Sequence, residues 1–167
     1  MKKIFILMLA LILALPFLAA PALAEAYVLT LFEPTGLDLS PYVGKALFLN
    51  FFTEWCPYCM LEMPDIKRVF DEYSRDELEI ILIHPWDRED ASHTESVRKR
   101  FELEELTFYE DPDQIIVRYL NLPGYPTSLF FDKEGDIAKA LPMMLTFEQM
   151  AEILDNMGVS RAETSDD

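Results

Sequence analysis

Cysteine is scarce in this chain of 167 residues, which contains only two. They are Cys56 and Cys59, and a disulfide between them would close too small a loop to stabilise a fold much through chain entropy. An exported domain held together by disulfides typically carries six or eight cysteines. A disulfide-stapled framework therefore explains this pair poorly, and we look for a chemical role instead.

Basic residues are also few. The chain has 14 Lys and Arg against 30 Asp and Glu, which gives a net charge of −16. Such acidity argues against nucleic acid or an anionic membrane surface as a partner. It favours solubility, or contact with a basic partner. The chain also lacks internal repeats and low-complexity stretches, so a repeat architecture is not expected.

Long apolar runs are absent except at the start, where one extends from Ile4 to Ala24. A short basic segment precedes this run, and the run ends in an Ala-x-Ala pattern. These features are typical of a secretory signal peptide, so residues 1–24 are predicted to direct export to the periplasm or another extracytoplasmic space. The alternative is an uncleaved membrane anchor through residues 4–24, since the run reaches the ~20 residues that a bilayer requires.

The remaining chain predicts one domain over residues 25–159, followed by a flexible acidic tail over residues 160–167. Strand and helix patterns alternate along the domain, which predicts an α/β fold with helices on both faces of a sheet. We expect strands at 27–32, 46–52, 78–83, 106–109, 127–131 and 136–141. We expect helices from Cys59 onward and at 92–101, 112–120 and 146–158, the third of them capped by Asp111 with Pro112 at its first position.

The two cysteines lie between the buried strand at 46–52 and the helix that follows. A strand that delivers Cys-x-x-Cys to a helix start is a device for making and breaking a disulfide. The free N–H groups and aligned peptide dipoles at that point stabilise a thiolate on Cys56. The thiolate is the form that attacks another disulfide, so the pair predicts thiol–disulfide exchange.

A second signal is the segment Gly-Tyr-Pro-Thr at residues 124–127, directly before a predicted strand. Proline cannot donate a ladder hydrogen bond and therefore tends to stand where a strand begins. A cis bond between Tyr125 and Pro126 is accessible there, because the cis form of an X–Pro bond costs only about 0.5–1 kcal/mol.

Together, Trp-Cys-x-x-Cys at a helix start, Pro64 inside that helix and Gly-Tyr-Pro-Thr before a strand resemble the thioredoxin superfamily. The resemblance implies a thioredoxin-like fold with a central mixed sheet flanked by helices. An extra strand–helix pair before Pro126 and an N-terminal strand extension are similar to the exported TlpA, ResA and CcmG proteins. Those proteins are thiol–disulfide oxidoreductases, and many are reductants in cytochrome c maturation.

The resemblance also implies roles for individual residues. Cys56 and Cys59 would form the redox disulfide, with Cys56 as the nucleophile and Cys59 as the resolving thiol. Pro126 would be cis and pack against the pair. The substrate-binding residues implied are Trp55, Pro57, Tyr58, Tyr125 and Pro126.

One position departs from thioredoxin itself. Thioredoxin has a buried Asp six residues before the first cysteine, where this chain has Asn50, which cannot titrate. In the ResA-like proteins a Glu three residues after the second cysteine takes part in proton handling, and Glu62 stands there. The resemblance therefore assigns the third catalytic role to Glu62. The alternative is an ordinary solvated glutamate on a helix surface.

The function predicted from these residues is an exported disulfide reductase without a cofactor, and the resemblance implies cytochrome c maturation as its setting. Its partners would be protein thiols or disulfides, such as those of apocytochrome c, and an upstream membrane or thioredoxin-type electron donor. We expect a monomer that does not bind nucleic acid. Two alternatives remain open: an exported oxidase or isomerase that uses the same cysteines, and a redox-silent binding module.

A metal site is the other chemistry that these residue types allow. His84 and His93 could join Cys56 and Cys59 as four zinc ligands. Their spacing matches no zinc motif, so no metal is expected. The simpler expectation is that both histidines face solvent.

Overall fold

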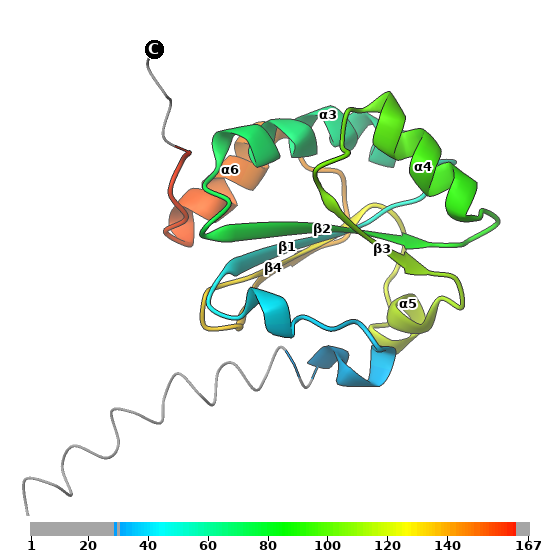
Figure 1. Ribbon diagram of the computed structural model, residues 1–167, viewed down its shortest axis with the longest axis horizontal. Coiled ribbons are helices and arrows are strands. Elements are labelled where there is room, and N and C mark those ends of the chain that lie inside the picture. The colour runs from blue at the N-terminus through cyan, green and yellow to red at the C-terminus, as the bar shows by residue number, and fades with distance from the viewer. Residues whose placement is uncertain (1–28, 30, 163–167) are drawn as a thin grey trace, which may run out of the picture.

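The computed structural model describes residues 29 and 31–162. The expected signal segment, residues 1–24, lies outside the described residues, as does the end of the expected tail. Among the residues that are described, no helix is both long and apolar enough to cross a membrane. Figure 1 shows a twisted sheet with helices on both of its faces.

Within the described part of the chain, the sheet has five strands in the order β3-β2-β1-β4-β5. The central strand β1 pairs with β2 in parallel and with β4 in antiparallel orientation. At the edges, β3 runs parallel to β2 and β5 runs antiparallel to β4. The sheet is therefore mixed, as predicted, and its strands are β1 (Ala46–Phe51), β2 (Leu78–Pro85), β3 (Thr107–Asp111), β4 (Thr127–Phe131) and β5 (Ile137–Leu141).

Helices α3, α4 and α6 cover one face of the sheet, and α5 covers the other together with the 3₁₀ turns η2 and η3 (Figure 1). Every residue of β1 is buried, because its alternate side chains enter the two cores on opposite faces. On the first face, Phe48 stacks on Phe130 with ring centroids 4.4 Å apart. The helical elements are η2 (Glu33–Thr35), η3 (Ser40–Tyr42), α3 (Pro57–Glu72), α4 (Ala91–Arg100), α5 (Ile115–Tyr119) and α6 (Phe147–Asn156).

The extra strand–helix pair predicted before Pro126 is present, because β2, α4, β3 and α5 all lie between α3 and β4. The last helix begins with a capping box. The Thr146 hydroxyl accepts the N–H of Gln149, whose side chain accepts the N–H of Thr146.

The expected N-terminal strand over residues 27–32 is wrong where the structure describes it. Leu29, Leu31 and Phe32 are helical, and no described residue before Ala46 belongs to a strand. Phe32 is fully buried and meets the edge of Phe131, with ring centroids 6.0 Å apart. The apolar side chains of this segment are thus buried because a helical turn packs onto the face of the sheet. A strand would instead have paired with the edge of the sheet.

The helix expected at 112–120 is shorter than predicted, and Asp111 is not its N-cap. Asp111 is the last residue of β3, and Gln114 precedes the first turn of α5. The Asp111 carboxylate still serves the helix, because it accepts the N–H groups of residues 115, 116 and 117 at 2.7, 3.0 and 3.4 Å.

The first residues of the expected flexible tail are fixed to the end of α3. The backbone of Arg161 forms an isolated antiparallel β-bridge with that of Tyr73, and the N–H of Ala162 donates to the carbonyl of Glu72 at 2.9 Å. The Arg161 guanidinium also lies 4.1 Å from the centre of the Tyr73 ring. Residues 163–167 lie outside the described part of the chain.

Candidate active site

The two cysteines lie at the start of α3, just after the loop that follows the central strand β1. Cys56 is the N-cap of α3, and its Sγ accepts the N–H of Cys59 at 3.2 Å. Both are free thiols, Cys56 being 3% exposed and Cys59 fully buried. The sulfur of Cys56 therefore has a helix N–H as a partner, as the sequence predicted, and this contact favours a negative charge on it.

The second predicted segment meets the cysteines from the neighbouring strand. The Tyr125–Pro126 peptide bond is cis, and Pro126 is buried at the start of β4. The Cys56 thiol lies 3.5 Å from the carbonyl oxygen of Tyr125, to which it donates. This meeting follows from the register of the sheet, in which Phe51 of β1 faces Thr127 of β4.

Three residues around Cys56 form an exposed rim. Trp55 is 45% exposed, Tyr58 is 63% exposed, and Pro57 between the cysteines is also exposed. The indole of Trp55 meets the ring of Tyr125 edge-on, with centroids 6.1 Å apart. The structure thus gathers all five residues expected to bind substrate beside Cys56.

Cys59 is the inner thiol of the pair. Its burial raises the pKa of the Cys59 thiol well above the ordinary value, and the hydrogen bond with Cys56 raises it further. A buried thiol of this kind reacts only if a nearby group accepts its proton. Glu62 lies three residues after Cys59 on α3, so the two buried side chains share one face of the helix.

Glu62 is fully buried on α3, and the surface alternative is therefore wrong. Its carboxylate accepts the N–H of Leu145 at 3.0 Å and the side-chain amide of Asn50 at 3.2 Å. Burial raises the pKa of Glu62 to about 7, although these two hydrogen bonds oppose the rise. A carboxyl group with this pKa can accept or return a proton near neutral pH.

Asn50 links Glu62 to the strand that carries the cis-proline. Its amide nitrogen also donates to the Ser128 hydroxyl at 3.0 Å. Its oxygen, Oδ1, is buried and has no hydrogen-bond partner among the described residues. Asn50 thus occupies the place of the thioredoxin Asp as a neutral hydrogen-bonding group, and the titrating carboxylate nearby belongs to Glu62.

Sequence reasoning missed a second buried titratable side chain, which contacts Glu89 and, through it, the backbone just before Cys56. His84 was expected to face solvent, but its side chain is fully buried at the end of β2, where its ring stacks on Phe52. One ring nitrogen lies 2.6 Å from the Thr94 hydroxyl, and the other lies 2.7 Å from the carboxylate of Glu89. The burial arises because α4 packs over this end of the sheet, which local spacing does not reveal.

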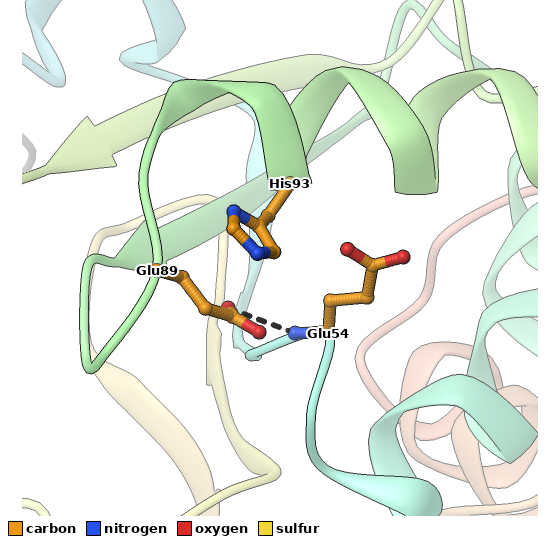
Figure 2. A group of neighbouring side chains, drawn as sticks. All are labelled: Glu54, Glu89 and His93. Atoms are coloured by element: carbon orange, nitrogen blue, oxygen red, sulfur yellow. Dashed lines mark hydrogen bonds between the residues drawn. The ribbon is translucent and has the colours of Figure 1, made fainter.

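Glu89 lies close to Glu54 and His93, and these three could in principle hold a metal ion. One ligand atom from each lies within 4.8 Å of the others, and Figure 2 shows the His93 ring near both carboxylates. These groups are already engaged, however. Glu89 binds backbone N–H groups and His84, and His93 is hydrogen-bonded to Asp90. We therefore assign no metal to this cluster.

Comparisons with known proteins identify the family of this chain. The model of the AhpC/TSA family matches residues 24–151. The chain belongs to this family. The AhpC/TSA chain is also 31% identical to the thiol–disulfide oxidoreductase ResA of Bacillus thuringiensis subsp. konkukian, over 78% of its own length and 74% of the relative's.

Other relatives carry the same class of activity in their names. This AhpC/TSA protein is 27% identical to the sporulation thiol–disulfide oxidoreductase A of Bacillus subtilis, over 79% of each chain. Its fold matches a secreted disulfide oxidoreductase of Mycobacterium tuberculosis with a TM-score of 0.63 at 22% identity, covering 72% of this chain and 87% of the other. The predicted thioredoxin-like fold is confirmed, and the protein is an enzyme of the thiol–disulfide oxidoreductase class.

Proposed function

We propose that this enzyme is an exported disulfide reductase that acts through Cys56 and Cys59, with cytochrome c precursors as the clients to test first. The observation that carries the proposal is the unequal setting of the two thiols. Cys56 lies at a helix start beside an exposed rim, whereas Cys59 is enclosed next to Glu62. This asymmetry suits an outer nucleophile and an inner resolving thiol.

In the first step, the Cys56 thiolate attacks one sulfur of a client disulfide. A bond forms between Cys56 and that sulfur, the client's S–S bond breaks, and the second client sulfur leaves as a thiolate that takes up a proton. The client's main chain would lie against the backbone of Tyr125. The exposed rings of Trp55 and Tyr58 would contact the flanking client side chains.

In the second step, Glu62 accepts the proton of Cys59. The resulting Cys59 thiolate attacks the sulfur of Cys56, the mixed disulfide breaks, and the client leaves with both thiols reduced. The enzyme is then oxidised to the Cys56–Cys59 disulfide. A membrane or thioredoxin-type dithiol must supply the two electrons that restore it.

Trapping the mixed disulfide tests this mechanism. Cys59→Ser removes the resolving thiol, so client proteins should accumulate on Cys56 and can be identified by mass spectrometry. The matched control Cys56→Ser should trap none. If both variants trap the same proteins in the same amounts, Cys56 is not the nucleophile.

The direction of electron flow is tested by the reduction potential of the Cys56–Cys59 couple. A value close to that of thioredoxin, about −270 mV, would support a reductase. A value close to about −120 mV would support the alternative oxidase. Reduction of insulin by the unmodified enzyme, together with its loss in Cys56→Ser, would exclude a redox-silent binding module.

Export is tested by the N-terminus of the protein in cells. If residues 1–24 are a cleaved signal peptide, the protein recovered from outside the cytoplasm should begin at Glu25. A protein that retains residues 4–24 and sediments with membranes would support the anchor instead. Recovery of the intact chain from the cytoplasm alone would contradict export.

A further inference from the structure

The connection between β2 and α4, residues 86–90, is attached to the backbone just before Cys56. Both oxygens of the Glu89 carboxylate take part. The N–H of Glu54 donates to one oxygen at 3.0 Å, and the N–H of Trp55 donates to the other at 2.8 Å. The indole N–H of Trp55 donates to the carbonyl of Asp87 at 2.9 Å. This connection therefore holds Trp55 at both its main chain and its side chain.

The carboxylate of Glu89 is itself held from behind. Its side chain is 3% exposed, and His84 contacts it at 2.7 Å from within the core. His84 in turn reaches Thr94 on α4 and stacks on Phe52, the residue that follows β1. A buried carboxylate with this many partners has little freedom to move, since each lost contact would leave a charge uncompensated in the interior.

We propose that Glu89, fixed by His84, is a positioning residue that holds the main chain of Glu54 and Trp55 so that Cys56 stays in its reactive place. This inference rests on the proposed function, in which Cys56 is the nucleophile. Cys56 is the N-cap of α3 and is the next residue after the two N–H groups that Glu89 binds. The carboxylate thus sets the orientation of the chain as it enters the helix.

Two effects of Glu89 on Cys56 oppose each other, which makes the inference testable. Its hydrogen bonds keep the Cys56 sulfur beside the N–H of Cys59, and this favours the thiolate. Its negative charge, at a short distance, disfavours a second negative charge on sulfur. If positioning dominates, removing the Glu89 side chain lowers the rate at which Cys56 is alkylated. If charge dominates, removing it raises that rate.

The test measures the rate at which iodoacetamide alkylates Cys56 in chains that carry Cys59→Ser. We expect Glu89→Ala to slow alkylation by roughly tenfold, the equivalent of one hydrogen bond to a charged group. Glu54→Gln is the matched control. It removes a carboxylate from the same stretch of chain, but that carboxylate accepts only the Ser96 hydroxyl and binds no backbone N–H among the described contacts. The control should alkylate within about twofold of the parent.

A second readout follows the two N–H groups themselves. In Glu89→Ala, the amide protons of Glu54 and Trp55 should exchange faster with solvent, while those of α6 keep their protection. Glu89→Gln retains one acceptor oxygen and the size of the side chain, so it should restore part of the alkylation rate. It also replaces Glu89→Ala in both measurements if the alanine variant does not fold.

An unchanged or faster alkylation in the folded Glu89 variants would overturn the inference, as would an equal loss in Glu54→Gln. Failure of the proposed function would look different. In that case Cys56 of the parent chain would react no faster than free cysteine, whatever stands at position 89. The amide exchange of Trp55 would then still show whether Glu89 holds this segment.

Discussion

Glu62 is a carboxylic acid enclosed by protein, and its pKa of about 7 lies above the value of 4.5 for an ordinary glutamate. The unfolded chain therefore releases this proton at a lower pH than the folded chain. Between these two values the folded state binds more protons, so the free energy of unfolding falls as the pH rises. Above about pH 7, the ionised Glu62 carboxylate lowers the free energy of unfolding by about 3 kcal/mol relative to low pH.

We predict that Glu62→Gln removes this pH dependence. Glutamine cannot ionise, and its amide nitrogen could donate to Oδ1 of Asn50, which has no partner among the described residues. Urea unfolding at about pH 5 and about pH 8 should show a smaller difference for the variant than for the parent. Glu104→Gln, at an exposed position, is the control and should keep the parent's dependence. Equal pH dependence in all three chains would refute the prediction.

The same substitution should slow the second chemical step. The variant lacks the carboxylate that accepts the proton of Cys59 in the proposed mechanism, so mixed disulfides on Cys56 should persist roughly a hundredfold longer at neutral pH. Quenched single-turnover reactions followed by mass spectrometry would measure their lifetime. The difference should shrink at high pH, where hydroxide removes the proton directly. A lifetime equal to that of the parent would remove Glu62 from the mechanism.

At the scale of elements, the short helix α5 depends on a carboxylate that belongs to the preceding strand. Asp111 is 4% exposed, and its carboxylate accepts three N–H groups in the first turn of α5. These N–H groups have no partners within the helix, and the carboxylate also compensates the positive end of the helix dipole. Asp111 therefore fastens α5 to the edge of the sheet.

Asp111→Ala should lower the free energy of unfolding by about 2–3 kcal/mol, because it leaves buried donors without an acceptor. Asp111→Asn keeps one acceptor oxygen and should lose clearly less. Chemical unfolding curves of the three proteins would give these values. If alanine and asparagine cost the same, the acceptor oxygen contributes nothing at this position.

For the whole molecule, the dominant electrostatic property is the net charge of −16. Raising the salt concentration from about 10 mM to about 150 mM shortens the screening length from about 30 Å to about 8 Å. Because like charges repel more strongly in the compact state than in the unfolded chain, screening should stabilise the fold. We therefore expect the thermal midpoint to rise by a few degrees, as measured by circular dichroism. A falling midpoint would mean that attractive pairs, such as those of Arg161, outweigh the repulsion.

Much of this architecture could be predicted from sequence, because its strands are continuous apolar runs. The segments 46–52, 78–83 and 127–131 are buried on both faces of the sheet, so their patterns are unambiguous. The cysteine pair and the cis-proline were also found, since each stands at a defined junction of strand and helix or strand and loop. Their meeting in space then followed from the order of the strands.

What could not be predicted depends on contacts between distant segments. Residues 31–32 carry apolar side chains that suit either a strand or a helical turn, and only the face of the sheet decides between them. His84 has no local pattern that distinguishes a buried from an exposed ring. Glu89 shows no sign in sequence that it binds Trp55, because that pairing arises only when α4 closes over the end of β2.

The contact between the Cys56 thiol and the Tyr125 carbonyl joins positions 69 residues apart in the chain. The ribosome therefore adds both cysteines well before it adds Tyr125, and β4 must then enter the sheet beside β1. Until that insertion, a growing chain carries both thiols without the Tyr125 carbonyl as a partner of Cys56. In the proposed mechanism, the Tyr125 backbone that receives the client is thus made late in synthesis, after the Cys56 nucleophile already exists.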